Sequence, residues 1–322
     1  MINSSKPLIL FFGYGSEYSL HSLYRYMCGL GDNCVEVDML THPNVVGELK
    51  KICGKPIIFV TSAHFLYDDR NFFYYKTHRK MISVLQVIST LRPVVSVYYP
   101  HDLKDPIKEE EMPYLPLFDL FLSPLPNLQY LEKYLPVINV GWIKCVSGHA
   151  RVMPDSFNPS RAVFFTGAYQ YYLNAGMDFF YQEYKPLFDA GIAVKMPLWH
   201  DNDLFEDFLR QREVKVYPSN ANSIDVMKEN EVMFTQALSS VNVEASGLGK
   251  KVVYIKSDIL DYKSPEKELE YFENIMYVDS PSAAAILDRG SILNNIPSIS
   301  YFDFVKARES IMTCFENRMV LK

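Results

Sequence analysis

The chain has 322 residues, of which 48% are hydrophobic and 22% are charged, so it can bury a sizeable core and is not disordered as a whole. This length predicts about two domains. The net charge of −6 argues against a nucleic-acid partner, and no basic run is longer than "GKK" at 249–251, so a polybasic membrane anchor has no support.

The first half of the chain reads as strands that alternate with helices. Apolar runs that end in turn residues predict six strands, at 7–13, 34–40, 56–61, 94–99, 118–123 and 137–142. Apolar residues at helical spacing lie between most of them, which predicts crossover helices and a parallel sheet covered on both faces. Residues 1–150 are therefore expected to form one Rossmann-like domain.

The same alternation restarts after 144–160, a segment with two prolines and several serines that we expect to connect two domains. The predicted fold class is therefore α/β, with two tandem Rossmann-like domains, the second at 151–300. The tail at 301–322 is expected to form a C-terminal amphipathic helix that packs back on the N-terminal domain. Ligands of such sheets bind at the carboxyl ends of the strands, so we expect a cleft between the two domains.

Several features bear on location. The N-terminal apolar run is too short for a signal peptide, and no window approaches 18 consecutive apolar residues. The five cysteines are scattered and form no CxxC pair, which predicts reduced thiols and no zinc site. We therefore expect a cytoplasmic protein without a transmembrane segment; peripheral association with a membrane stays open.

The stretch "FTQALSSVNVEASGLGKKVVYI" at 234–255 predicts a strand, a polar turn, a helix and a second strand. Helix capping explains one serine and contributes about 1 kcal/mol. It does not explain two adjacent serines, Ser239 and Ser240, preceded by Thr235 and Gln236. The alternative is a binding site for a donor phosphate, because the first turn of a helix offers free N–H groups and a positive dipole end.

This stretch resembles the C-terminal nucleotide-sugar-binding region of GT-B glycosyltransferases. The matching residues are Glu244, Ala245, Leu248, Gly249, Lys250, Val252 and Val253. Its serine pair further resembles bacterial surface-polysaccharide transferases, which use CMP-sugars or CDP-glycerol. The resemblance implies a GT-B fold, a bacterial origin, donor phosphates at Ser239 and Ser240, and Glu244 near the ribose or sugar of the donor.

Other donor-binding residues follow from the same comparison. The segment "FFTGAYQYY" at 164–172 resembles the GT-B loop after the first strand of the second domain, which places Gly167 at the donor. The CMP-sugar families carry a His-Pro motif where this chain has Tyr217, so the chain departs from them there. Lys195, in the predicted strand "IAVKMPL", is a candidate phosphate partner because its ammonium can pair with an anion.

The catalytic candidates lie in the predicted N-terminal domain. The strand at 94–99 leads into Pro-His-Asp, which puts His101 and Asp102 at the carboxyl edge of the sheet. Either side chain could take a proton from an acceptor hydroxyl, and so could Glu17 in the loop "FGYGSEYS". A surface turn with helix capping explains the same residues without any chemistry.

The acceptor is expected near the ends of the first and third predicted strands. Gly13 and Gly15 let the backbone approach a substrate, and Tyr14 lies between them. His64 follows the third predicted strand and could shape the same site. The only "DxD" form, at 201–203, lies at a predicted helix start, so we expect no bound metal and no cofactor apart from the donor itself.

These residues leave three hypotheses. The first is a metal-independent GT-B glycosyltransferase that moves a sugar from a nucleotide-sugar to a saccharide acceptor in surface-polysaccharide or glycan synthesis. The second is an enzyme like UDP-GlcNAc 2-epimerase, which shares the two-domain form. The third is a non-catalytic protein that binds a nucleotide or a sugar. The sequence names neither the sugar nor the oligomeric state.

Overall fold

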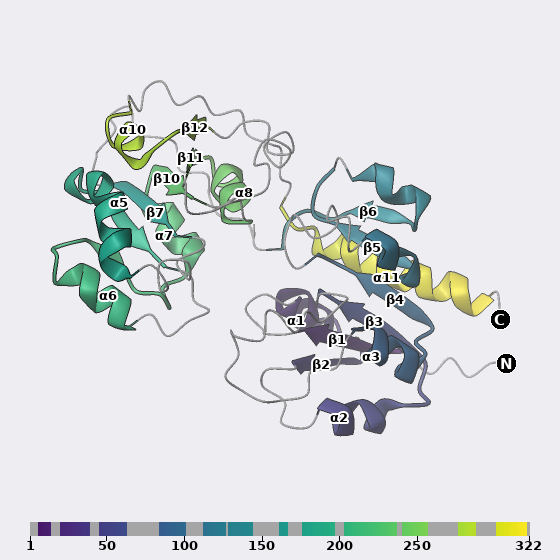
Figure 1. The fold of residues 1–322 in the computed structure, drawn as a ribbon. Coiled ribbons are helices and arrows are strands. Elements are labelled where there is room, and N and C mark those ends of the chain that lie inside the picture. The colour runs from purple at the N-terminus through teal and green to yellow at the C-terminus, as the bar shows by residue number, and fades with distance from the viewer. Residues whose placement is uncertain are drawn as a thin grey trace. The chain divides into compact units, whose positions relative to one another are not determined.

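The structure is a computed structural model. It describes residues 6–13, 20–38, 45–62, 84–100, 112–126, 128–143, 161–166, 176–196, 203–236, 240–256, 276–287 and 301–320. The chain divides into two compact units (Figure 1). The first comprises Met1–Val146 together with Ile299–Lys322, and the second comprises Ser147–Ser298.

The first unit is built on a six-stranded parallel sheet. Its strands are β1 Leu8–Gly13, β2 Cys34–Asp38, β3 Ile57–Thr61, β4 Val95–Tyr98, β5 Leu120–Ser123 and β6 Val137–Asn139. They lie in the order β2-β1-β3-β4-β5-β6. Strands β1, β3, β4 and β5 are buried along their whole length, which explains their continuous apolar sequences. The six strands predicted for this half are confirmed, each within a few residues.

The described part of the first unit also contains helices. They are α1 His21–Gly29, α2 Val45–Ile52, α3 Val84–Leu91, the short 3₁₀ helices η3 Met112–Leu117 and η4 Gln129–Lys133, and α11 Phe304–Val320. The segment 128–136 contains a 3₁₀ helix and not an α-helix, with bonds such as Tyr134 N–H to Leu131 O at 2.8 Å. The segment is short and ends at Pro136, and short segments favour the tighter i→i+3 pattern.

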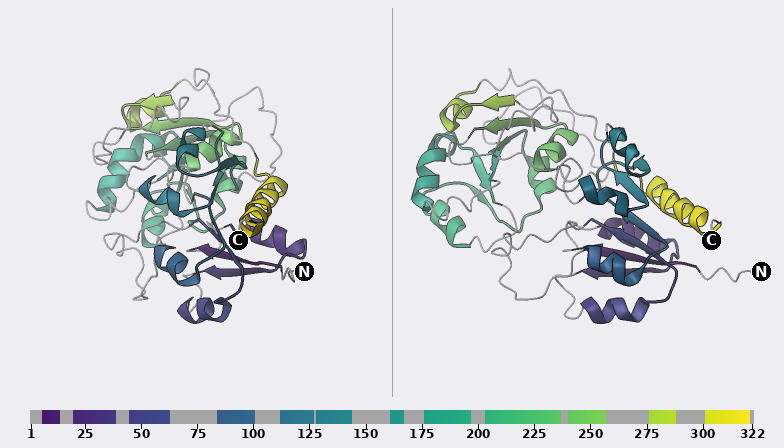
Figure 2. Two further views of the ribbon diagram at one scale, coloured as in Figure 1. Left: turned by 90° about the vertical axis from the view of Figure 1, so that its right-hand side faces the viewer. Right: turned by 45° about the vertical axis from the view of Figure 1, so that its right-hand side comes forward.

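Helix α11 belongs to the first unit and lies against β4 and β5 (Figure 2). Its buried face consists of Ala307, Ile311 and Phe315. The guanidinium of Arg308 donates two bonds to the Asp32 carboxylate, at 2.6 and 2.8 Å. These contacts join the last helix of the chain to the turn after α1.

The second unit contains a second six-stranded parallel sheet. Its strands are β7 Ala162–Phe165, β8 Ala193–Lys195, β9 Val216–Tyr217, β10 Val232–Thr235, β11 Lys251–Ile255 and β12 Met276–Val278, in the order β12-β11-β10-β7-β8-β9. Strand β9 is only two residues long. Residues 211–213 form a turn in which Glu213 has a positive φ of 62°, so pairing starts after this turn.

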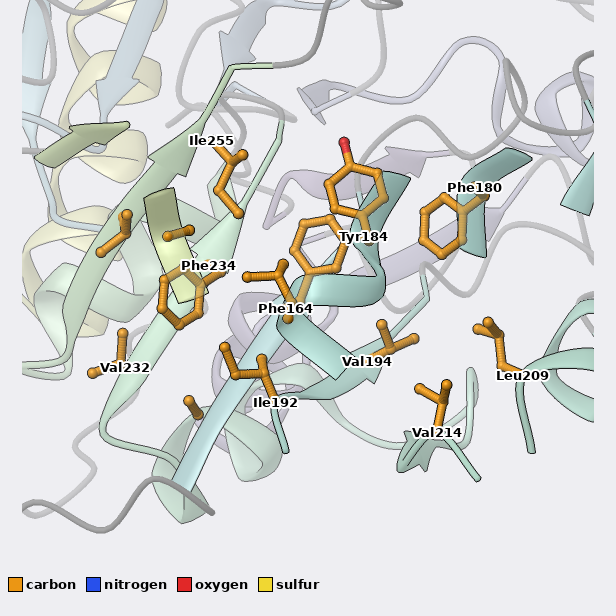
Figure 3. Packing of buried hydrophobic residues seen from close by; sticks show 14 of the residues in the cluster. Phe164, Phe180, Tyr184, Ile192, Val194, Leu209, Val214, Val232, Phe234 and Ile255 are labelled. Atoms are coloured by element: carbon orange, nitrogen blue, oxygen red, sulfur yellow. The ribbon is translucent and has the colours of Figure 1, made fainter. Parts of the chain in front are cut away.

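Helices cover both faces of this sheet. They are α5 Met177–Asp189, α6 Asp203–Arg210, α7 Ser223–Glu229, α8 Ser240–Gly247 and α10 Pro281–Ala285. Helices α5, α6 and α10 pack on one face, where Phe164 lies among the side chains drawn in Figure 3. Its ring is 4.6 Å from that of Tyr184. Helices α7 and α8 pack on the other face, around Val163, Phe165 and Met233.

In each sheet the strand order reverses at one point, where the chain returns past its first strand to build the other half of the sheet. In the second unit the chain runs from β7 outwards to β8 and β9, and then returns to the other side of β7 to build β10, β11 and β12. The connections after β7 and after β10 therefore lead to helices on opposite faces, α5 and α8. Such a switch point opens a crevice at the carboxyl ends of its two strands. In the first unit the corresponding switch point lies between β1 and β3. Within the described ranges, none of the helices is long and apolar enough to cross a membrane.

Candidate functional site

The carboxyl edge of the second sheet carries a pair of polar residues at its switch point. Phe165 of β7 and Thr235 of β10 are register partners, so the next residues, Thr166 and Gln236, follow on neighbouring strands. Adjacent strands lie about 4.8 Å apart, which makes these two residues close neighbours. The Thr166 N–H donates to the Lys195 carbonyl at 3.1 Å, so Thr166 continues the pairing toward β8.

Both side chains are buried, and their polar atoms have no partner among the residues that the structure describes. Gln236 is 0% exposed and Thr166 is 3% exposed. Across the described part of the chain, no group hydrogen-bonds the Gln236 Oε1, the Gln236 Nε2 or the Thr166 hydroxyl. A buried polar group without a partner costs about 1–3 kcal/mol. Three such atoms on neighbouring strand ends of a switch point indicate a place where a ligand completes the hydrogen bonds.

The helix that follows β10 adds further buried polar groups. Helix α8 begins at Ser240, and the side chains of Asn242 and Glu244 in its first turns are only 1% and 2% exposed. Thr235 is 3% exposed. These three side chains are therefore buried inside the second unit. The helix ends where Gly249 adopts a positive φ of 72°, as its sequence predicts.

Lys195 lies inside the second unit, at the end of β8. Its ammonium donates to the carbonyls of Met196 at 2.7 Å and Ser219 at 2.8 Å. Burial lowers the pKa of Lys195 to about 8, and the nearby Glu206 carboxylate opposes this shift. Glu206 is itself buried and accepts a bond from the Ser219 N–H at 2.7 Å. The two charged residues thus hold both backbone groups of Ser219, in the loop after β9.

Tyr217 hydrogen-bonds to residues at the C-terminal end of α7, the next helix in the chain. Its hydroxyl accepts a bond from Asn230 Nδ2 at 3.0 Å and lies 3.4 Å from Glu229 Oε2. Asn222, in the same loop as Ser219, caps α7 by accepting a bond from the Ile224 N–H at 2.8 Å. The loop 218–222 is therefore fixed at both ends, by the Lys195–Glu206 pair and by the cap.

At the carboxyl edge of the first sheet, the residue that follows β4 is held by several contacts. Tyr99 follows this strand, is 1% exposed, and donates its hydroxyl to the Gly141 carbonyl at 3.1 Å. The same hydroxyl accepts a bond from the Ile143 N–H at 2.8 Å, and the ring stacks on Trp142. Phe302, just before α11, packs edge-on against it. Gly13 ends β1 at the switch point of this sheet, where the Thr61 hydroxyl donates to the Phe12 carbonyl at 2.9 Å.

The structure describes part of the predicted site. It describes Gly13, Lys195, Tyr217, Thr235, Gln236 and Glu244, and the backbone of Ser240. The other predicted residues lie outside the described ranges: Tyr14, Gly15, Glu17, His64, His101, Asp102, Gly167 and Ser239. Thr235 and Gln236 lie at the end of β10, and Glu244 lies in α8, the helix that follows this strand.

Three residues of this edge were not singled out from the sequence: Thr166, Glu206 and Ser219. Thr166 had a usable signal, because "AVFFT" and "VMFTQ" are both apolar runs that end in a polar residue. Glu206 and Ser219 had none, since their roles depend on contacts with Lys195 and with each other.

Comparisons with known proteins show what this arrangement is similar to. No family model and no curated protein sequence matches the chain. Solved structures match over nearly its full length. The wall teichoic acid polymerase TagF, in a structure soaked with CDPG, has a TM-score of 0.54 and 10% identity, over 98% of this chain and 89% of that one.

Two further structures are similar at the same level. A UDP-N-acetylglucosamine 2-epimerase structure from Listeria monocytogenes has a TM-score of 0.52 and 11% identity, over 95% of both chains. The glycotransferase of kitacinnamycin has a TM-score of 0.50 and 12% identity, over 98% of this chain and 99% of that one. At such identities the likeness concerns the fold. Two Rossmann-like units, each with a six-stranded parallel sheet, and a C-terminal helix in the first unit give this chain the GT-B fold.

Proposed function

We propose that the chain is a metal-independent glycosyltransferase that moves a sugar from a nucleotide-sugar donor to a saccharide acceptor, in surface-polysaccharide or glycan synthesis. The observation that supports this most is the set of buried, unpartnered polar atoms of Thr166 and Gln236 at the switch point of the second sheet. Ligands of open α/β sheets bind in that crevice. The GT-B fold, which the chain shares with solved transferase structures, is the reason for proposing a transfer reaction.

The donor side belongs to the second unit. The phosphates would lie at the start of α8, where Ser239, Ser240 and the free N–H groups of the first helical turn supply donors without a metal. Glu244 and Gln236 would contact the rest of the donor, and Gly167 would let the backbone approach it. Lys195 and Tyr217 would support this edge from inside the unit, because the Lys195 ammonium already bonds to the Ser219 carbonyl and the Tyr217 hydroxyl to Asn230.

The acceptor side belongs to the first unit. Gly13, Tyr14, Gly15 and His64 would line the acceptor site at the ends of β1 and β3. A base there takes the proton of the acceptor hydroxyl, the acceptor oxygen bonds to the anomeric carbon, and the nucleotide leaves with the electrons of the broken C–O bond. His101, Asp102 and Glu17 are the candidates for this base. Tyr99, two residues before His101, is held in place by two hydrogen bonds of its hydroxyl.

A second candidate function is supported by the likeness to the 2-epimerase structure. The two functions differ in their need for an acceptor. Incubation of the full chain with UDP-glucose, UDP-GlcNAc, CMP-sialic acid and CDP-glycerol, with and without a saccharide acceptor, separates them by measuring free nucleotide. Release only with the acceptor supports the transferase, whereas release of UDP from UDP-GlcNAc alone supports the epimerase-like function.

The donor site is tested by nucleotide binding. We expect one or more of UDP, GDP, CDP, CMP and TDP to raise the melting temperature of the full chain, with a chelator present throughout. At 100 times its Kd a nucleotide adds about 2.7 kcal/mol of stability. A variant with both Ser239→Ala and Ser240→Ala is expected to lose most of this response, because it loses two donors to the phosphate.

Ser280→Ala is the matched control, because Ser280 caps α10 in the same unit and accepts the Ala283 N–H at 3.2 Å. It should lower stability by about 1 kcal/mol and keep the nucleotide response. If the double variant behaves in the same way, Ser239 and Ser240 are caps and the phosphate assignment is wrong. A wild-type chain that responds to no nucleotide contradicts the proposed function itself.

A further inference from the structure

The hydrogen-bonding character of the unpartnered atoms of Thr166 and Gln236 also indicates which part of a nucleotide-sugar donor they could bind. Gln236 leaves both an acceptor, Oε1, and a donor, Nε2, without a partner, and Thr166 leaves a hydroxyl that can do either. Neither side chain is charged. A ligand that completes this set must donate as well as accept.

A phosphate does not meet that requirement. Its oxygens are ionised acceptors, so they would serve Gln236 Nε2 and the Thr166 hydroxyl but leave Gln236 Oε1 unpaired. Lys195, which ends the neighbouring strand β8, directs its ammonium at the carbonyls of Met196 and Ser219. A hydroxyl group does meet it, because one hydroxyl donates to Oε1 while it accepts from Nε2.

The positions of the two residues favour a shared ligand. Phe164 on β7 and Phe234 on β10 both point to the face covered by α5 and α6. Side chains alternate along a strand, so Thr166 and Gln236, two residues further on, fall on that same face. The residues between them, Phe165 and Thr235, belong to the opposite face by the same alternation. Two neutral polar side chains thus end two adjacent strands on one side of the sheet.

We infer that Thr166 and Gln236 bind a hydroxyl-bearing part of the nucleotide-sugar donor, either its ribose or its sugar, and not its phosphates. This assignment rests on the proposed function. It separates the edge into a neutral part at Thr166 and Gln236 and a phosphate part at the start of α8.

The test replaces each residue by an apolar side chain of similar size, Gln236→Met and Thr166→Val, in the full chain. The free protein should keep its melting temperature or gain stability, because each change removes buried polar atoms that have no partner. Kd values should be measured by calorimetry for UDP, GDP and CDP, their 2′,3′-dideoxy forms, UDP-glucose and inorganic pyrophosphate. Each variant is expected to weaken binding of the hydroxyl-bearing probe about three- to tenfold and to leave pyrophosphate binding unchanged.

The probes distinguish the two sources of the hydroxyl. If the ribose binds here, the variants weaken the ribonucleotides but not their 2′,3′-dideoxy forms, which lack both ribose hydroxyls. If the sugar binds here, they weaken UDP-glucose but not UDP. Gln211→Met and Thr313→Val, at two exposed positions, are the matched controls and should change none of these values.

Other results overturn the inference. A large loss of stability in the free Gln236→Met or Thr166→Val protein means that the side chains have a structural role. Weaker pyrophosphate binding means a phosphate site, and an equal loss for ribo- and dideoxy-forms of UDP, without a further loss for UDP-glucose, means a contact with the base. If nucleotides bind the wild type and both variants equally, only this inference fails. If none binds the wild type, the proposed function fails with it.

Discussion

Lys195 shows how a residue at the edge of a site can serve the protein rather than the ligand. The residue is 1% exposed, and its ammonium bonds to two backbone carbonyls, one directly after its own strand and one in the loop after β9. Glu206 holds the N–H of the same loop residue, Ser219. This pair replaces the solvent around two buried charges with fixed partners, and so keeps the loop 218–222 in one position.

The lowered pKa of Lys195 predicts a pH dependence of stability. The pKa is about 8 in the folded chain and 10.5 in the unfolded chain. Below pH 8 both states carry the proton and burial of the charge destabilises the fold; above it the folded chain releases the proton first, so stability rises until pH passes 10.5. Between about pH 7 and 9.5 the wild type should gain about 2 kcal/mol relative to Lys195→Met.

Urea unfolding at the two pH values measures this gain. The matched control is Lys215→Met, which removes an exposed lysine two residues before Tyr217. Its difference from the wild type should stay constant with pH. A constant difference for Lys195→Met as well would mean that Lys195 is not buried as a titrating group.

At the scale of elements, α11 is the part of the chain whose position depends most on distant partners. Arg308 bonds to Asp32 in the turn after α1, and Arg318 pairs with Asp119 just before β5. Asp119 in turn accepts the Ser96 N–H of β4 at 2.8 Å. The helix therefore links the first and the last parts of its own sheet.

The Arg308–Asp32 pair should contribute measurably to stability. Its two bonds are parallel and charged, and the Asp32 side chain is only 10% exposed, so Arg308→Met leaves a carboxylate poorly solvated. We expect a loss of about 1–2 kcal/mol in urea unfolding. Lys306→Met, at an exposed position of the same helix, should change stability by less than about 0.5 kcal/mol. Equal losses in the two variants would show that the pair contributes nothing specific.

At the scale of the whole molecule, the two units differ in how the chain builds them. The second is continuous, Ser147–Ser298, whereas the first needs the C-terminal segment Ile299–Lys322 to complete it. That segment supplies Phe302, Ile311 and Phe315 to the interior of the first unit. Burial of each contributes roughly 1.5–3 kcal/mol, a large share of the roughly 5–15 kcal/mol that stabilises a whole domain.

Fragments should reveal this difference. A fragment of residues 147–298 is expected to unfold cooperatively in urea, followed by circular dichroism. A fragment of residues 1–146 is not expected to do so, unless residues 299–322 are joined to it by a short glycine-serine linker. Cooperative unfolding of 1–146 alone would mean that α11 is an addition to a complete domain.

The sequence by itself determined the elements of this protein. Buried parallel strands are continuous apolar runs, and helix ends show as glycines such as Gly191 and Gly249, which adopt positive φ values of 74° and 72°. These signals are local, so strands and helices could be placed within a few residues. The sequence also pointed to the polar turn at 235–244, because polar side chains between apolar runs are visible without knowledge of the fold.

The tertiary structure alone decided the strand order and the partners of the polar groups. The order places β7 beside β10, although about 70 residues separate them, and so brings Thr166 next to Gln236. It gives Lys195 two backbone partners, where its position in the sequence suggested a phosphate. Whether a buried polar atom has a hydrogen-bond partner depends on residues far away in the chain, and a local sequence pattern does not show which of them come close to it.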